Sequence, residues 1–434
     1  MLQVGSASVD ITPNLGCHLI GYFNDRIATA IHDPLHAKAL AISNGEMTIG
    51  IVVCDLIAVP GDVVRAAKER IASETGVPPE RVMICATHTH TGPSIKSSLG
   101  TPATEGYAEW VAPRIADAFI QASRQLRPAQ VAFTRGNCAS EVHNRRRVMK
   151  DGSVRMNPGY QHPDMVRPAG PTDPELGVLI FRSPDREPLG VLANLGLHYV
   201  GAGVHDAVSA DYFAEFGVAL QRIAGARFQA ILANGCFGDI NNCDFDRPAR
   251  TSPDPYFQIR RVANVVAAEA WKVWNILREE DFRDEVPLGA QLEMVPFKAR
   301  VPSPEELAQA KARLAAGDDP NDHEWVYARE LVLMESEPSE WEVPISAMRI
   351  GELGLVGLPG EVFSQIGLDI KAASPFAQTM LLGLANGTVG YVATDQAMDE
   401  GSYETRLCRH VRAPKGTHAL WMETAVRLLN GLKG

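Results

Sequence analysis

The sequence predicts an α/β protein, with one large domain of mixed β-sheets flanked by helices. Short apolar runs rich in β-branched residues alternate along the chain with longer stretches of helical periodicity. The connections between them are mostly short, and neither an internal repeat nor a low-complexity tract interrupts the 434 residues. We therefore expect residues 1–434 to form a single domain.

The clearest strand signal is residues 47–59 (MTIGIVVCDLIAV), which are apolar at nearly every position. An unbroken apolar run is typical of a strand that is buried on both faces. After it we expect, in chain order, a helix over 62–75, a strand over 82–86, a helix over 104–126, a strand at 131–133, a hairpin of 178–181 with 189–197, a helix over 212–223, a strand over 228–233 and a helix over 256–277.

Residues 303–337 differ from the rest, because they are charged and rich in alanine. Ser303 before Pro304 is a favoured helix start, and Gly317 to Asn321 separates two helical stretches. We expect a peripheral helical hairpin with a structural role; a lid is the alternative. Two further strands at 347–350 and 353–358 and a helix over 362–370 complete the expected fold.

The composition limits the classes of function. With 45% hydrophobic and 21% charged residues the chain can bury a large core, and a net charge of −11 disfavours a nucleic-acid-binding surface. No apolar run reaches the roughly 18 residues that span a bilayer. The seven cysteines contain no CxxC pair, and residues 1–5 lack the pattern of a signal peptide. We expect a cytoplasmic protein with a small-molecule partner; a homo-oligomer is compatible with the sequence.

The most informative motif is residues 86–93 (ATHTHTGP), which directly follow the expected strand at 82–86. On an extended backbone, His88 and His90 would face the same side. They would lie at the carboxyl end of a strand, where α/β folds place their sites. Imidazole pairs suit zinc and related divalent metals. The alternative is two partly exposed histidines in a polar loop.

Further polar residues follow other apolar strands. His198 ends the run 192–197, and His205 is the competing ligand in the same stretch. Asp239 follows the strand over 228–233 and could orient a ligand imidazole, or the loop could simply cap the strand. Glu361 follows the strand over 353–358, either as a metal ligand or as a glutamate in the first turn of a helix.

Two more groups have both a chemical and a structural interpretation. Arg145, in the basic cluster 143–147, could hydrogen-bond a substrate carbonyl or carboxylate, or lie in a solvated turn. Tyr391 and Tyr403 enclose a polar segment. Buried tyrosine normally packs and hydrogen-bonds, whereas a metal-bound or oxyanion-stabilising tyrosine is rarer.

Taken in chain order, these pieces resemble the neutral/alkaline (non-lysosomal) ceramidase family. The resemblance rests on Ile11-Thr12-Pro13, the stretch 86–93, Asn144-Arg145, His198, Gly238-Asp239, Gly360-Glu361 and the spacing from Tyr391 to Tyr403. It covers most of the chain and implies that residues 1–434 correspond to the catalytic domain of that family, with 303–337 as a helical insertion. We expect no counterpart of the C-terminal immunoglobulin-like domain of that family.

The resemblance implies a zinc-dependent hydrolase that cleaves an amide bond of an N-acyl amine through metal-activated water. It implies His90 as the acid/base or oxyanion-stabilising residue and Arg145 as a contact to the substrate amide, with Asp239 and Tyr403 also among the catalytic residues. The implied zinc ligands are His88, His198, Glu361 and Tyr403.

The sequence also departs from the family. Asn241 stands where the family has a serine after its Gly-Asp pair, which disfavours a serine-based mechanism. Residues 199–203 (YVGAG) replace a Pro-Thr-Ser type sequence. A ceramide-like substrate and a smaller amide or ester therefore both stay open. Two other functions also stay open: a metal hydrolase of another class, such as an amidohydrolase barrel or an esterase, and a ceramidase-like binding protein without turnover.

Overall fold

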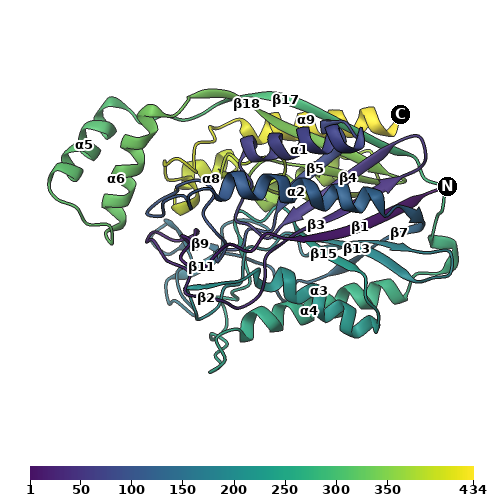
Figure 1. The fold of residues 1–434 in the computed structure, drawn as a ribbon. Helices are drawn as coiled ribbons and strands as arrows, with labels where there is room; N and C mark the ends of the chain where they lie inside the picture. The colour runs from purple at the N-terminus through teal and green to yellow at the C-terminus, as the bar shows by residue number, and fades with distance from the viewer.

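The computed structural model describes residues 1–434. It contains three main β-sheets, each with helices on its outer side (Figure 1). The first sheet has the order β5-β4-β3-β1-β6, and α1 (Gly61–Thr75) and α2 (Tyr107–Arg124) cover it. Its strands are β1 (Gln3–Asp10), β3 (His36–Ser43), β4 (Thr48–Cys54), β5 (Val82–Ala86) and β6 (Arg127–Pro128).

The second and third sheets have four strands each, in the orders β15-β13-β12-β7 and β17-β18-β19-β21. Helices α3 and α4 cover the second sheet, and α7 and α9 cover the third. The bounds are β7 (Gln130–Asn137), β12 (Glu175–Arg182), β13 (Pro188–Leu195), α3 (Asp211–Ala224), β15 (Gln229–Asn234), α4 (Phe257–Asn275), β17 (Leu288–Lys298), β18 (Glu340–Ile350), β19 (Leu353–Gly357), α7 (Ser364–Ala373), β21 (Gln378–Leu382) and α9 (Thr417–Lys433).

The inner faces of the three sheets share one apolar interior. Ile51 of β4, Leu192 of β13 and Leu355 of β19 belong to the same buried cluster. On β4 the alternate residues Val52 and Cys54 instead pack with the helices outside the first sheet. The prediction of a strand buried on both faces is therefore confirmed, and the fold class is α/β with mixed sheets as expected.

Strand β4 ends at Cys54, five residues before the expected end, because the next residue is a buried acid. The fully buried Asp55 accepts hydrogen bonds from Lys38 Nζ (3.0 Å) and from the backbone N–H of His36 (2.9 Å). A buried carboxylate needs such partners. The strand therefore ends before Asp55, whose side chain is held by these hydrogen bonds.

Short elements connect the layers at one end of the molecule. They are β2 (Ala30–Ile31), β8 (His143–Asn144), β9 (Arg146–Met149), β10 (Val154–Met156), β11 (Met165–Pro168), β14 (Ala207–Val208), β16 (Ile240–Asn241), β20 (Glu361–Val362), β22 (Tyr391–Val392) and α8 (Asp395–Glu400). Glu361 therefore lies in a short strand, and the expected helix begins at Ser364, so the interpretation of Glu361 as a first-turn glutamate is wrong.

The expected helical hairpin is confirmed as α5 (Pro304–Ala315) and α6 (His323–Leu333), which project from one end of the molecule (Figure 1). The Ser303 hydroxyl accepts the N–H of Glu306, and the Glu306 side chain accepts the N–H of Ser303. This reciprocal cap satisfies two donors that a helix start leaves free.

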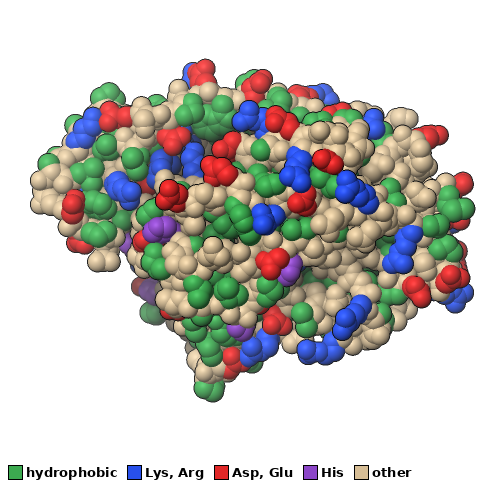
Figure 2. All heavy atoms as spheres, in the orientation of Figure 1, with side chains coloured by type: hydrophobic (Ala, Val, Ile, Leu, Met, Phe, Trp, Pro, Cys, Tyr) green, Lys and Arg blue, Asp and Glu red, His purple; other side chains and the backbone are tan.

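The surface gives no sign of a large single-sign patch on the face shown in Figure 2, where basic and acidic side chains are mixed. None of the helices combines the length and the hydrophobicity that crossing a bilayer would require.

Three buried asparagines tie the sheets to one another in pairs. Asn194 of β13 donates to the carbonyl of Leu381 in β21 (2.9 Å), and Asn234 of β15 donates to the carbonyl of Thr87 after β5 (3.1 Å). Asn386 accepts the N–H of Ile84 in β5 (3.1 Å) and donates to Ser346 in β18 (3.1 Å). Directional bonds of this kind fix how far each strand end lies from the others.

We expect Asn194→Ala to lower the free energy of unfolding by about 1–3 kcal/mol, because it leaves a buried carbonyl without its donor. Urea denaturation followed by fluorescence measures the difference. Asn430→Ala, on the exposed side of α9, is the control and should change it by less than about 0.5 kcal/mol. Equal effects in the two variants would contradict the role of the buried amide.

Candidate metal centre

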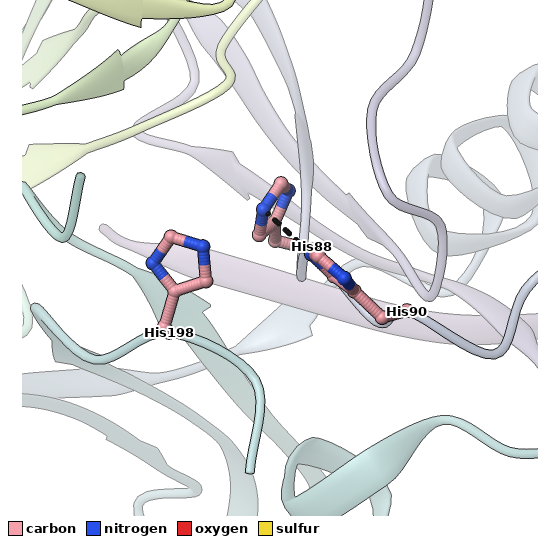
Figure 3. Close-up of side chains that lie close together, drawn as sticks. All are labelled: His88, His90 and His198. Atoms are coloured by element: carbon pink, nitrogen blue, oxygen red, sulfur yellow. Dashed lines mark hydrogen bonds between the residues drawn. The ribbon is translucent and has the colours of Figure 1, made fainter. Parts of the chain in front are cut away.

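Three buried side chains from different sheets meet at one point. His88 follows β5, His198 follows β13 and Glu361 follows β19, and each of these strands pairs in parallel with a neighbour. Their relative exposures are 3%, 1% and 7%, respectively. His90 lies beside His88, so that the structure brings together four of the residues that the sequence singled out. Figure 3 shows the three histidines.

The two histidines of the HxH motif converge, but not for the expected reason. The backbone of His88 is not extended: its φ is +70°, and the strand has already ended at Ala86. The resulting turn brings the Nε2 atoms of His88 and His90 within 3.1 Å of each other. A left-handed conformation in a residue other than glycine is uncommon and is found preferentially at functional sites.

Each of the three imidazoles is fixed by a backbone carbonyl at Nδ1. A carbonyl only accepts, so each Nδ1 carries the hydrogen and each Nε2 presents a lone pair. This is the tautomer in which histidine binds a metal through Nε2. The acceptors are Ile57 O for His88 (2.8 Å), Gly21 O for His90 (2.8 Å) and Phe237 O for His198 (3.1 Å).

Burial disfavours the charged form of His198 and of His90. It lowers the pKa of His198 well below the ordinary value, and the adjacent Arg145 guanidinium lowers it further. Burial, together with the neighbouring His88, likewise lowers the pKa of His90. Both rings are therefore neutral near pH 7, which is the state that a metal requires.

The carboxylate of Glu361 faces this cluster of lone pairs. Its Oε2 atom lies 3.2 Å from Nε2 of His88 and 3.6 Å from Nε2 of His198. It is buried and has no hydrogen-bond partner, since neither contact has hydrogen-bond geometry. Converging lone pairs without a donor are costly in the absence of a cation.

This donor set fits a divalent metal. The ligating nitrogens of His88, His90 and His198 lie within 4.8 Å of one another and could hold an ion. Two or three imidazoles with one carboxylate are a typical ligand set for catalytic zinc.

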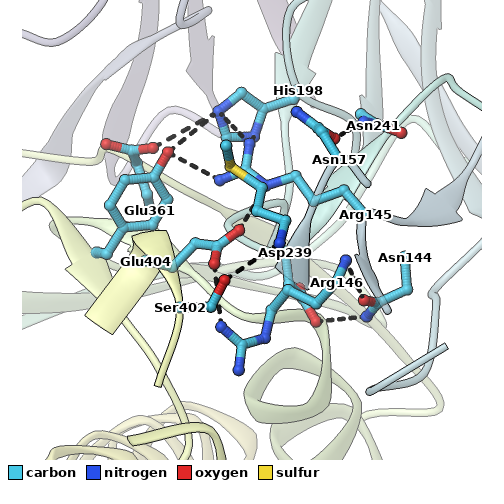
Figure 4. A network of polar contacts seen from close by, with 12 residues as sticks. Asn144, Arg145, Arg146, Asn157, His198, Asp239, Asn241, Glu361, Ser402 and Glu404 are labelled. Atoms are coloured by element: carbon cyan, nitrogen blue, oxygen red, sulfur yellow. Dashed lines mark hydrogen bonds and ion pairs between the residues drawn. The ribbon is translucent and has the colours of Figure 1, made fainter. Parts of the chain in front are cut away.

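Arg145 adjoins the cluster on the side of His198 (Figure 4), and Tyr391 contacts both residues. Tyr391 Oη lies 3.5 Å from Nε2 of His198 and accepts a hydrogen bond from Arg145 (3.0 Å). Arg145 also donates to Glu404 (2.8 Å), and its Nη1 lies 3.3 Å from Nε2 of His198. Burial opposes the charge of Arg145, but Tyr391 and Glu404 outweigh it and raise its pKa. The basic cluster is thus buried and is not a solvated turn.

The structure brings Tyr391 rather than Tyr403 into contact with the cluster. In the parallel pair of β20 and β22, Tyr391 is directly opposite Glu361, so both side chains leave the same face. Tyr403 starts a short 3₁₀ turn, packs edge-on against Tyr391 (5.7 Å between ring centroids) and makes no hydrogen bond with His88, His198 or Glu361. The spacing of residues along the sequence does not show which residue of one strand lies opposite which residue of the other.

The expectation that Asp239 orients an imidazole is wrong. Its carboxylate accepts hydrogen bonds from the backbone N–H of Ser364 (2.8 Å) and from Asn144 (2.8 Å) and touches no histidine. Its backbone carbonyl accepts the N–H of Arg145 (2.8 Å). Asp239 therefore braces the short strand that carries Arg145 against the start of α7. Asn241 is also outside the cluster and donates to Asn157 (2.7 Å).

Burial distinguishes His198 from His205. His198 lies in the buried cluster, whereas His205 is exposed, packs its ring edge-on against Tyr22 and accepts a hydrogen bond from Arg26 at its backbone carbonyl (2.7 Å).

The cluster opens into a cavity of about 610 Å³, whose walls include His88, His90, Glu361, Tyr391 and Tyr403. A second cavity of about 790 Å³ contains none of these residues. The sequence analysis missed Glu404, which is buried beneath Arg145, and His410, which lines the first cavity. Neither follows an apolar strand, so no sequence signal set them apart.

Solved structures share this fold. The neutral ceramidase from Pseudomonas aeruginosa matches with a TM-score of 0.77 at 19% identity, over 100% of this chain and 74% of that chain. A ceramidase complexed with C2 matches with a TM-score of 0.76 at 18% identity, over 100% of this chain and 75% of that chain. No protein-family model and no curated protein sequence matches the chain. The chain therefore has the fold of these ceramidase structures, as the resemblance implied.

We expect His198→Ala to weaken zinc binding by about 100-fold or more, because it removes a buried donor atom whose orientation is fixed. His205→Ala is the matched control, seven residues away and exposed, and should bind zinc as the unaltered protein does. Competition titration against a chromophoric chelator measures both affinities. Weaker zinc binding in His205→Ala than in His198→Ala would indicate that His205 is the ligand.

Proposed function

We propose that this protein is a zinc-dependent hydrolase that cleaves the amide bond of an N-acyl amine. The observation that carries the proposal is the buried Glu361 Oε2, which faces the lone pairs of His88 and His198 and lacks a hydrogen-bond partner. The ceramidase fold supports amide chemistry in particular. The sheets are open layers and not a closed barrel, which disfavours the amidohydrolase alternative.

In this proposal His88, His198 and Glu361 hold the metal, and Tyr391 takes the fourth protein position in place of Tyr403. Zinc in such a site would polarise a carbonyl and would lower the pKa of a bound water to about 7.

His90 is suited to move protons. Its Nδ1 is fixed by the carbonyl of Gly21 (2.8 Å), and its ring stacks on Tyr199 with centroids 3.7 Å apart. Its free Nε2 faces the cluster and the cavity, 3.1 Å from Nε2 of His88. In our proposal it accepts a proton from the attacking water and donates it to the leaving amine.

Arg145 acts mainly through Tyr391. Its Nε and Nη2 are already bonded to Glu404 and Tyr391. We therefore propose that it orients the Tyr391 hydroxyl toward the reacting carbonyl, and that direct contact with the substrate is secondary. Glu404 balances the buried positive charge.

We expect one zinc per chain and zinc-dependent release of amine from N-acyl amines of graded chain length. His88→Ala should lose both zinc and turnover. His90→Ala should keep zinc and lose roughly 10²-fold in kcat, which is typical for the loss of acid–base help. Zinc content and amine release measure the two effects separately.

Several outcomes would contradict this proposal. Full zinc binding and turnover in His88→Ala would remove the proposed ligand set, and loss of zinc in His90→Ala would indicate a site of three histidines. Cleavage of esters alone would favour the esterase alternative. A zinc-loaded protein that is inactive on both amides and esters would favour a binding protein.

The two tyrosines give a further test. We expect Tyr391→Phe to weaken zinc binding and to lower kcat/KM by about 10²-fold, since the hydroxyl beside the metal is lost. Tyr403→Phe keeps the same ring in the cavity wall and should retain the zinc affinity. The opposite result would restore Tyr403 as the ligand.

A further inference from the structure

One wall of the 610 Å³ cavity carries a group of basic side chains, Lys96, Arg409 and Arg412. They come from two segments far apart in the sequence, and they stand out in a protein whose net charge is −11. The other parts of the wall include the apolar residues Ile20, Ile57 and Leu384.

Arg412 is buried and makes no direct ion pair with a carboxylate. Its relative exposure is 3%. Nε donates to the carbonyl of Arg300 (3.4 Å) and Nη2 to the carbonyl of Pro338 (2.8 Å), while the guanidinium lies 5.2 Å from the centre of the Trp341 ring. Nη1 has no hydrogen-bond partner. The side chain is thus held in place with one donor atom free.

The neighbouring cations are neutralised. Arg409 makes a paired contact with the fully buried Glu330 of α6 (2.7 and 2.8 Å) and uses its remaining nitrogen on Ser97 (3.2 Å). Lys96 lies 3.7 Å from Glu337. Arg412 is therefore the cation of this wall that is available to bind an anionic ligand.

The remaining charges of the cavity do not neutralise the positive charge of Arg412. Burial lowers the pKa of Arg412, and Glu337 offsets only part of that effect. The other acidic side chains of the cavity are Asp62 and Glu361, and Glu361 belongs to the metal cluster. A buried charge without a partner is costly, and an anionic ligand would relieve that cost.

We propose that the substrate carries a carboxylate that Arg412 binds, so that the preferred substrates are amides that combine an apolar chain with an acidic group, and not neutral lipid amides. This inference rests on the proposed hydrolase function. The apolar walls receive the chain, and the free Nη1 of Arg412 supplies the donor for the carboxylate.

The test compares N-octanoylglycine with N-octanoylethanolamine, which have the same chain and differ in the acidic group. We expect kcat/KM to favour the glycine conjugate by about tenfold or more. Arg412→Gln should abolish this preference by lowering the rate for the glycine conjugate alone, and Arg412→Lys should restore part of it. Arg406→Gln, which removes a cation already paired with Glu324, is the control and should keep the preference.

The carboxylate can sit on either side of the amide, and the mono-octylamide of succinic acid distinguishes the two. Faster cleavage of this compound than of N-octanoylglycine would place the acidic group on the acyl side. Equal rates for acidic and neutral amides would overturn the inference but leave the hydrolase function intact.

Calorimetric binding of N-octanoylglycine gives an answer that is independent of turnover. If no amide is cleaved, binding that weakens about tenfold or more in Arg412→Gln, but not in Arg406→Gln, would keep the inference while the hydrolase proposal fails. Equal binding to both variants would overturn it. Arg412→Lys provides the same comparison if the glutamine variant does not fold.

Discussion

The site depends on how the ends of three sheets are fixed relative to one another. Asn194, Asn234 and Asn386 form hydrogen bonds that join the sheets in pairs, next to the strands that lead to the metal cluster. Apolar contacts fill the shared interior, but they are non-directional. The hydrogen bonds of a buried amide are directional, because a shift leaves a donor or an acceptor unpaired. This constraint lets ligands from distant segments meet at one point.

The candidate metal site also depends on residues that would not touch a bound ion. Backbone carbonyls at Ile57, Gly21 and Phe237 select the tautomer of each imidazole. Three further buried side chains are linked to His198. Glu404 accepts a hydrogen bond from Arg145 and balances its charge, Arg145 donates to Tyr391, and Tyr391 contacts His198. Arg412 and Lys96 lie on loops outside the cluster, so in our proposal the substrate preference can vary without a change in the ligand set.

Much of the fold and part of the site could be predicted from the sequence. The predicted strand at 82–86 has the same two ends as β5, because a short continuous apolar run is typical of a fully buried strand. His88, His198 and Glu361 were recognisable because each follows such a run. Strand β4 was predicted too long, since the burial of Asp55 depends on Lys38 and the backbone of His36, which no local pattern shows.

The sequence by itself determined the fold class, the order of the main strands and helices, and the kinds of donor atoms that follow several strands, because hydrophobic patterning and residue chemistry are local properties. Only the tertiary structure decided which donors meet. The register of β20 with β22 places Tyr391 beside Glu361, burial separates His198 from His205, and Ser364 and Asn144 occupy the carboxylate of Asp239. These outcomes depend on contacts between residues far apart in the chain, which sequence periodicity does not encode.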